Sequence, residues 1–557
     1  MPSLTTDDIR WLLDRNDKLK ATRLLYEPLW EEIATYIFPR RIGIGYKPEL
    51  GQKQTSLLYD STAIHSNELL AASMHGTLTP SSSKWFSLKL RDETLNRVKE
   101  VMDWLDTCGD RMYLALRQSN FNSEIHEVFL DQGAFGTACL LVEERPIKTF
   151  GFQGLQFQAC QNSGYCVDED AEGKVDTLFR EFELTARAAI AKWGEENVGQ
   201  KVRDAKTSNK NDEKFKFLHC VYPTADGRTE QPFISYYIGM DEKIEIATKK
   251  YYEFPFMVPR WSKSSGETYG RGPGHTALPD VKTLNKAKEF GLKAWAKDLD
   301  PPTFERDGGV IGSLKLWPGG RNVARDKDSI WTMDHKIRYD VSQIKEDELR
   351  QSIRQIFYSD QLKLQEGPEM TATEVQVRYE LMQRLLGPTI GRDESELMNP
   401  LIERVFGCMF RANSKSFQVL PPPPPILAKM GIREIDIEYE GPLAKAQRMS
   451  ELGANKQTYA VAIDMSTVQP EVLDNLDGDM AIRTTAEIVG AAKILRSMEE
   501  VAKIRADRAQ AQAAEQQKQD MERMALGAGK AAPAIKALSE ASGGQANSGQ
   551  QGAGGEA

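Results

Sequence analysis

The sequence predicts a mainly helical protein of the α+β class, and three observations lead to this prediction. Segments with apolar residues at helical spacing recur through most of the chain, whereas alternation of β-forming and polar residues is concentrated in residues 137–256. A length of 557 residues exceeds one ordinary domain, so several regions with their own core are expected. Apolar residues make up 40% and charged residues 27%, a balance typical of globular proteins.

Helices are expected to dominate the first 135 residues. Apolar faces predict a helix over 6–37, with Asp7 or Asp8 as its cap, and further helices over about 62–76, 96–117 and 121–135. A strand is expected at 84–88. Strands should follow from 139 towards Tyr165 and again over 231–256, where β-formers alternate with charges as in half-buried antiparallel strands.

Residues 266–360 predict two helices joined by a small β-rich tip, and the rest of the chain is expected to be organised around them. The first helix runs from about 277 to 298 and ends at Asp300-Pro301-Pro302, because a helix cannot continue through two prolines. Apolar runs at 310–311 and 314–317, separated by glycines, predict short strands and turns. The second helix is expected over about 341–364.

The first of these helices carries two opposite faces. On a helical wheel its large apolar residues fall on one side, and its lysines gather on the other around Glu289. The apolar face comprises Val281, Leu284, Leu292, Trp295 and Leu299; the basic face comprises Lys282, Lys286, Lys293 and Lys297. A solvated outer surface and a basic rail facing a polyanion are both compatible with this pattern, and the wheel does not decide between them.

After residue 360 a loop is expected up to Met370, and Thr371 is expected to cap a long helix. Pro388 and Pro400 fall within that helix and predict a kink. The five prolines of 421–425 indicate a stiff connector rather than a recognition ligand. A strand is expected at 435–439, then helices over 442–462, 470–495 and 497–526. The composition of 527–557 predicts a disordered tail.

No pattern of catalytic residues is found, and no cofactor is expected. The phosphate-binding loop, the dinucleotide fingerprint, the HExxH motif and the GxSxG elbow are all missing, and the six histidines are scattered. Cys160, Cys166 and His219-Cys220 could gather a metal, but without a CxxC pair the default is free thiols in a reducing cytoplasm. The polar N-terminus and the shortness of the apolar runs predict a soluble intracellular product without a membrane span.

Four groups of residues, in this order along the chain, carry a resemblance to a known family. They are 58–62 with 74–80 and Trp85-Phe86; 259–261 with 266–274; 370–375; and 481–483 through 493–497. In these residues the chain resembles the head-to-tail connector, or portal, proteins of short-tailed (podovirus-type) bacteriophages. Gly490-Ala491-Ala492 departs from the family pattern, where a proline is expected, and this affects only the local loop shape.

The resemblance implies a portal fold assembled as a ring, usually of twelve subunits, at one vertex of the capsid. Double-stranded DNA would pass through the ring during packaging and ejection. The implied partners are the large terminase, the major capsid protein, a scaffolding protein and tail adaptor or nozzle proteins, with assembly in the host cytoplasm and no membrane. The implied parts are a wing (1–273), two stem helices (274–298 and 341–360), a clip (299–340), a tunnel loop (361–373), a long kinked helix with the wing return (374–441), a crown (442–496), a barrel helix (497–526) and the tail.

On this resemblance the basic face becomes a candidate for contact with DNA. The channel candidates are Lys282, Lys286, Lys293 and Lys297 on the first stem helix, with Lys363 and Glu366 in the tunnel loop. The candidates for docking of the motor or tail lie in the clip and are Arg306, Lys315, Trp317, Arg321 and Arg325. The net charge of −9 argues against a tight nucleic-acid binder and suits DNA that must slide. A nucleic-acid-processing or ATP-hydrolysing packaging subunit is the alternative, and the missing phosphate loop argues against it.

Overall fold

The structure is a computed structural model, and its described residues fall into two compact units, Met1–Gln447 and Arg448–Ala557. The described residues are 4–41, 43–44, 55, 57–81, 83–92, 94–145, 152–224, 230–315, 317, 320–332, 339–362, 386–412, 419–430, 435–439, 452–453, 456–465, 469, 471, 476–489, 495–496 and 500–519.

The first unit begins with helices, as predicted. The single helix predicted over residues 6–37 is in fact two helices. The chain breaks between α1 (Thr6–Leu24) and α2 (Glu27–Tyr36), and Pro28 occupies the first turn of α2, where a proline is tolerated. The cap of α1 is Thr5, which exchanges hydrogen bonds with Asp8, so Asp8 is the partner of the cap and not the cap itself. The next helices match their predicted ranges to within a few residues: α3 (Thr62–Leu78), α4 (Lys99–Gln118) and α5 (Phe121–Phe135).

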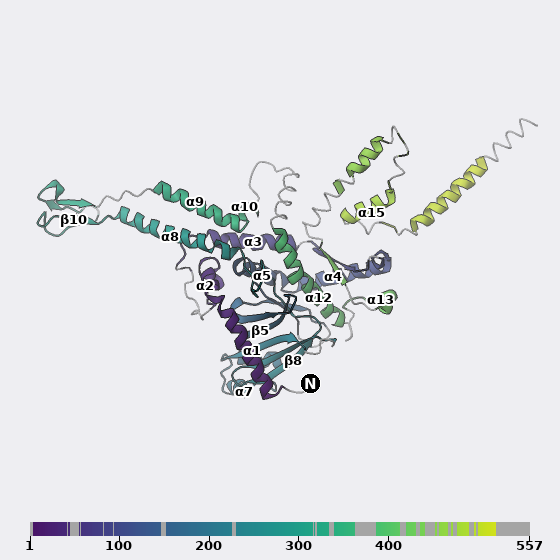
Figure 1. Cartoon of the computed structure of the whole chain (residues 1–557), viewed down its shortest axis with the longest axis horizontal. Helices are drawn as coiled ribbons and strands as arrows, with labels where there is room; N and C mark the ends of the chain where they lie inside the picture. Colours follow the sequence, from purple (N-terminus) through teal and green to yellow (C-terminus); the bar gives the residue numbers. More distant parts are fainter. Residues whose placement is uncertain are drawn as a thin grey trace, which may run out of the picture. The chain divides into compact units, whose positions relative to one another are not determined.

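The described residues of this unit form three antiparallel sheets, in addition to the small strands of the tip. Strands β5 and β8 of the largest sheet are labelled in Figure 1. The five-stranded sheet has the order β4-β5-β6-β7-β8, so each strand pairs with its neighbour in sequence. Its strands are β4 (Tyr165–Glu169), β5 (Val175–Thr185), β6 (Lys214–Pro223), β7 (Phe233–Gly239) and β8 (Ile244–Tyr251). A three-stranded sheet contains β3 (Leu155–Ala159), β2 (Leu140–Glu144) and β9 (Phe256–Met257), and a two-stranded sheet pairs β1 (Phe86–Leu90) with β14 (Ile435–Tyr439).

Two short helices within the β-rich region were not predicted. They are α6 (Ala186–Trp193), capped by the Thr185 side chain, and α7 (Gln200–Thr207). Single turns of 3₁₀ helix occur at Pro39–Arg41, Leu95–Arg97, Asn162–Gly164 and Lys327–Ser329.

Helix α5 lies at the centre of the largest hydrophobic core. Every residue from Val128 to Phe135 is buried, as expected for a helix covered on all sides. Its neighbours include α3, α8 (Pro273–Leu299), β2 and β3. Trp30 packs against Tyr269 at a ring-centroid distance of 5.0 Å, which joins α2 to the segment that leads into α8.

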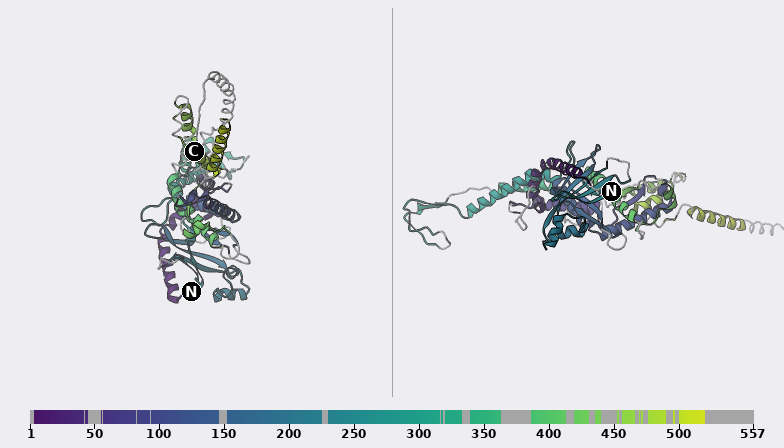
Figure 2. Two further views of the ribbon diagram at one scale, coloured as in Figure 1. Left: turned by 90° about the vertical axis from the view of Figure 1, so that its right-hand side faces the viewer. Right: turned by 90° about the horizontal axis from the view of Figure 1, so that it is seen from below.

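The predicted unit of two helices and a small β-rich tip is present, with different bounds. Helix α8 begins at Pro273, four residues earlier than predicted, and α9 (Tyr339–Ile356) ends earlier than predicted. Tyr358 has a positive φ of 57° and separates α9 from α10 (Ser359–Leu362). The tip pairs β10 (Thr303–Glu305) with β13 (Ile330–Thr332) and β11 (Val310–Ile311) with β12 (Val323–Ala324); among the described residues of 314–317 no strand forms. We call residues 273–356 the arm; Figures 1 and 2 show it projecting from the part that holds the sheets.

Helical residues 386–393 continue through a π-helical segment, Glu394–Met398, into α12 (Asn399–Ala412). Pro388 and Pro400 lie within this continuous helix, as predicted, and the π segment supplies the local irregularity expected there. The proline run leads into the short helix α13 (Pro425–Met430). The loop predicted from residue 361 starts too early, because residues 361–362 are the end of α10. The rest of that loop and the cap at Thr371 lie outside the described residues.

The second unit contains helical residues 456–465, α15 (Gly478–Val489) and helical residues 500–519. They overlap the three helices predicted there, with different bounds: the first continues to residue 465 instead of 462, and residues 476–477 and 495, inside the second predicted range, are not helical. Arg505 forms two hydrogen bonds of 2.6 and 2.7 Å with the Asp479 carboxylate. The predicted tail 527–557 and Gly490–Ala492 lie outside the described residues.

Candidate functional site

The arm starts where glycines allow the chain to pass very close to the end of α5. A Cβ added to Gly272 would lie 2.7 Å from the Gln132 carbonyl oxygen, and one added to Gly274 would lie 2.2 Å from that of Ala134. Both distances are shorter than the 3.0 Å below which a Cβ atom essentially never approaches another heavy atom, so a residue with a side chain would not fit at either position. The glycine-rich sequence before α8 is therefore required to seat the base of the arm on α5.

A buried asparagine connects α8 to residues 58–62, one of the segments that carry the family resemblance. Asn285 is 3% exposed, and its Oδ1 accepts hydrogen bonds from the backbone N–H groups of Tyr59 (2.8 Å) and Asp60 (3.2 Å). Its Nδ2 donates to the Val281 carbonyl at 2.9 Å. One side chain thus satisfies three backbone groups, which fixes this segment against the arm.

The same segment is also attached to α9. Arg350 donates to the Asp60 carboxylate at 3.0 Å and forms ion pairs with Glu346 and Asp347 on its own helix. Burial alone would raise the pKa of Asp60, but hydrogen bonds from Thr62 and Arg350 outweigh it and lower that pKa. The base of the arm is therefore held through residues from three separate parts of the chain.

Polar contacts also join the two helices of the arm directly. Lys288 on α8 forms an ion pair of 3.0 Å with Glu346 on α9, and Ser352 donates to Asp280 at 2.7 Å. Glu346 is shared with Arg350 at 3.5 Å, so one carboxylate contacts cations from both helices. These contacts fix the register of α8 against α9.

Three of the four lysines on the basic face have a carboxylate partner. Lys286 and Lys293 both contact Glu289, at 2.8 and 2.5 Å, and Lys282 contacts Glu32 of α2 at 3.0 Å. Hydrogen bonds from Lys286 and Lys293 lower the pKa of Glu289 to about 2, so this carboxylate stays ionised. Lys297 lies in the last turn of α8, near the negative end of the helix dipole.

The apolar face of α8 is buried only where the helix crosses the rest of the unit. Val281 and Leu284 are each 1% exposed, whereas Leu292 is 48%, Trp295 55% and Leu299 68% exposed. Phe290 of α8 and Ile344 of α9 are also exposed. Phe290 lies on the side of the lysines, where Lys286 sits over its ring, so it is not part of this face. We call Leu292, Trp295 and Leu299 the apolar strip. A single subunit does not bury the outer half of the predicted apolar face.

The tip at the end of the arm exposes aromatic as well as charged side chains. Phe304 and Trp331 face each other across β10 and β13, with their rings stacked 5.8 Å apart, and both are exposed. The five predicted docking residues, Arg306, Lys315, Trp317, Arg321 and Arg325, are all exposed, and Lys315 lies over the Trp317 ring. Lys363 and Glu366 lie outside the described residues.

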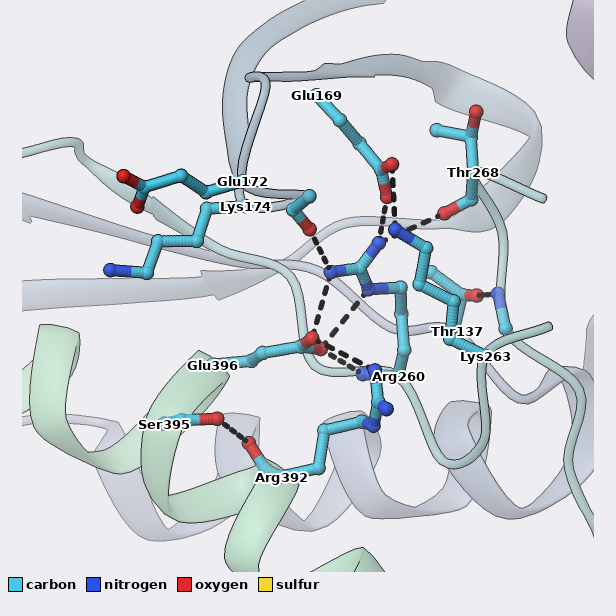
Figure 3. A network of polar contacts seen from close by, with 12 residues as sticks. Thr137, Glu169, Glu172, Lys174, Arg260, Lys263, Thr268, Arg392, Ser395 and Glu396 are labelled. Carbon is cyan, nitrogen blue, oxygen red and sulfur yellow. Dashed lines mark hydrogen bonds and ion pairs between the residues drawn. The ribbon is translucent and has the colours of Figure 1, made fainter. Parts of the chain in front are cut away.

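A buried arginine joins the segment before α8 to the continuous helix of residues 386–412, which we call the long helix (Figure 3). Arg260 is 1% exposed, and its guanidinium donates to Glu396 in the π segment at 2.7 and 3.1 Å. It also contacts Glu169 at the end of β4 and donates to the Gly173 carbonyl at 2.9 Å. Lys263 and Arg392 complete the network through Glu169 and Glu396, at 2.7 and 3.3 Å.

Sequence reasoning noted Pro259-Arg260-Trp261 only as part of the resemblance and did not assign Arg260 a role. The available signal was a charged residue within an apolar stretch, which indicates a buried and paired charge. The partner could not be inferred, since Glu396 lies 136 residues further along the chain.

The described residues contain no group of three or more His, Cys, Asp and Glu side chains arranged to hold a metal ion. All six cysteines are free and buried. Within the described part of the chain, no helix is both long and apolar enough to cross a bilayer.

Comparison with known proteins agrees with the family that the sequence resembles. The chain is 28% identical over 526 residues to the "Probable portal protein" of Bordetella phage BPP-1, covering 91% of this chain and 92% of the relative. It is 27% identical over 552 residues to the "Portal protein" of Salmonella phage epsilon15, covering 95% of each. Among solved structures, a chain of "Virion of native gene transfer agent (GTA) particle" aligns with a TM-score of 0.31 and 12% identity, covering 77% of this chain and 95% of that one.

The family model described as "Bacteriophage head to tail connecting protein" matches residues 10–495, which is most of the chain. The predicted family is therefore confirmed. The chain belongs to the bacteriophage head-to-tail connecting proteins, the portal proteins, which are structural components of the virion and not enzymes.

Proposed function

We propose that this chain forms a closed ring of twelve subunits at one capsid vertex, through which double-stranded DNA is packaged and ejected. The observation that carries the proposal is the apolar strip on α8, which a single subunit leaves exposed. A contiguous row of large apolar side chains in a virion structural protein indicates a surface that another subunit covers.

The energy available from the strip is sufficient for a contact that is repeated around a ring. Full burial of one large apolar side chain stabilises by about 1.5–3 kcal/mol. The three residues of the strip are roughly half to two-thirds exposed, so covering them would contribute about 3–5 kcal/mol per interface before the entropy of association is counted. A closed ring adds such a contact for every subunit.

Helix dimensions are consistent with a passage for DNA. Twelve helices spaced about 10 Å apart place their axes on a circle roughly 38 Å across, which leaves a bore of roughly 28 Å. B-form DNA passes through such a bore with room for water. In this arrangement α8 and α9 are the stem and the tip is the clip, with the wing formed by residues 1–273.

The basic face of α8 is proposed to face the passing DNA. Its three partnered lysines already contact Glu289 or Glu32, so each phosphate contact would displace a carboxylate. Such contacts are weak and strongly dependent on salt. They suit a transient brake against slippage better than stable binding.

The tip is proposed as the docking site for the large terminase during packaging and for tail adaptor or nozzle proteins afterwards. Its exposed Phe304, Trp317 and Trp331 supply apolar contacts, and the surrounding arginines supply polar ones. The major capsid protein and a scaffolding protein are proposed as the partners of the wing.

Ring formation is tested by native mass spectrometry and negative-stain microscopy of the purified chain. Trp295→Glu places a charge in the strip and should shift rings towards monomers while leaving the circular dichroism spectrum unchanged. Met102→Glu is the matched control, because Met102 is 44% exposed on α4, outside the strip, and should leave rings intact. Wild-type protein that stays monomeric at micromolar concentration in several salts would contradict the proposal. An ATPase assay tests the alternative, and turnover by the pure chain would favour it.

A further inference from the structure

Besides the Arg260 network, a buried side-chain contact joins the long helix to α5. Two polar atoms of this contact have no hydrogen-bond partner among the described residues. Asp393, the residue before the π segment, and Gln132, on α5, are both fully buried at 0% exposure. Gln132 Nε2 donates to Asp393 Oδ1 at 2.5 Å. Among the described residues, the other two oxygens of this pair, Gln132 Oε1 and Asp393 Oδ2, have no hydrogen-bond partner.

Both unsatisfied atoms are acceptors if Asp393 is ionised. Two buried acceptors without donors would each cost about 1–3 kcal/mol, and more for the charged oxygen, so native proteins rarely retain such an arrangement. A carboxylic acid and a primary amide are both planar and can form two hydrogen bonds at once. One added proton would therefore satisfy both orphaned atoms.

We propose that Asp393 is held as the neutral carboxylic acid and forms a reciprocal pair with Gln132, in which Oδ2–H donates to Gln132 Oε1 while Gln132 Nε2 donates to Oδ1. The pair is a proton-dependent latch between the long helix and α5. Removing the proton leaves a charge and two facing acceptors in a closed site, and the latch is then destabilised.

The charged groups around the pair favour the neutral form. On its own helix Asp393 lies near Glu394, Glu396 and Arg392, and Arg260 from the segment before α8 is occupied by Glu396. On α5 the neighbouring Asp131 is paired with Arg41 at 2.9 Å. Burial, followed by the charges of Glu396 and Glu394, raises the pKa of Asp393 to about 8 despite the hydrogen bond from Gln132 and the charge of Arg392.

The latch has a defined effect on the pH dependence of stability. Asp393 binds its proton more tightly in the folded than in the unfolded chain, so its contribution is fully present below the unfolded pKa and is lost as pH rises towards about 8. One proton changes the unfolding equilibrium by at most about tenfold per pH unit over this range.

The test compares full-length wild type with Asp393→Asn. The Asn side chain carries both a donor and an acceptor at every pH, so it can form the same two hydrogen bonds without binding a proton from solution. The ratio of the wild-type unfolding constant to that of the variant, measured in urea, should rise by up to about tenfold per pH unit between about pH 5 and 8 and then level off. Asp103→Asn, an exposed position on α4, is the control and should follow wild type at every pH. A ratio between wild type and Asp393→Asn that does not change with pH would overturn the proposal.

A measurement on wild type alone keeps the proposal testable if the variant does not fold. Asp131, the other fully buried carboxyl beside the pair, has a pKa raised by burial to about 6 and is ionised first. Infrared difference spectra in D₂O should therefore show the loss of one protonated-carboxyl band between about pH 7 and 9. Absence of that band at pH 7 would mean that an ionised Asp393 shares a bridging water with Gln132, and the latch would be refuted.

Discussion

Replacing Arg260 with methionine should strongly destabilise the first unit, because Arg260 joins three separate segments. The substitution keeps most of the side-chain volume and removes the guanidinium, leaving Glu396 and Glu169 without their main partner. Removing one partner of a buried ion pair costs about 3–5 kcal/mol. Lys263 and Arg392 remain near the two carboxylates, whose side chains are 19% and 16% exposed, so the lower end of that range, about 3 kcal/mol, is expected.

Urea unfolding followed by tryptophan fluorescence measures this loss. The control is Lys206→Met, which breaks an ion pair with Glu195 in which both side chains are about half exposed; it should cost less than about 1 kcal/mol. A double-mutant cycle with Glu396→Gln should give a coupling energy of about 1–3 kcal/mol. A loss below about 1 kcal/mol for Arg260→Met, or additive effects in the cycle, would refute the claim that the network holds these segments together.

Three further outcomes are expected. Asn285→Leu should lower unfolding stability by about 1–3 kcal/mol, since it leaves the N–H groups of residues 59 and 60 unsatisfied; no change in urea unfolding would contradict this. Glu289→Gln should free Lys286 and Lys293 and strengthen binding to duplex DNA at low salt, with the gain lost at high salt in a filter-binding titration. Lys286→Gln with Lys293→Gln should leave assembly unchanged but alter DNA retention in filled heads; unaltered retention would argue against a lysine-lined channel.

The parts of the fold that the sequence predicts are those governed by local rules. The spacing of apolar residues along the sequence predicted α4, α5 and the strand β14. The two prolines after Asp300 predicted where α8 ends. The break between α1 and α2 was missed although Pro28 marks it, because the apolar pattern continues through Leu24 and Leu25. Helices α6 and α7 were missed because each has only eight residues, too short for a periodic pattern to be distinct.

The contacts that hold the arm could not be predicted, because they join distant residues. The wheel placed Lys286, Lys293 and Glu289 on one face correctly, and their three- and four-residue spacing agrees with the observed ion pairs. The contact of Lys282 with Glu32 spans 250 residues, and no local pattern indicates it. A single subunit buries only the first half of the apolar face, and no local pattern indicates where along the helix that burial ends.

The pairing of the lysines changes how the charge of the arm should be understood. A lysine beside a carboxylate has little net attraction for a phosphate, because binding the phosphate requires that the carboxylate either loses its partner or lies near a second anion. In the proposed channel, Glu289 would therefore oppose each phosphate that Lys286 and Lys293 attract. The attraction felt by passing DNA would stay small at every position along the helix. The local arrangement of acids and lysines, more than the net charge of −9, would then let DNA slide while opposing slippage only weakly and transiently.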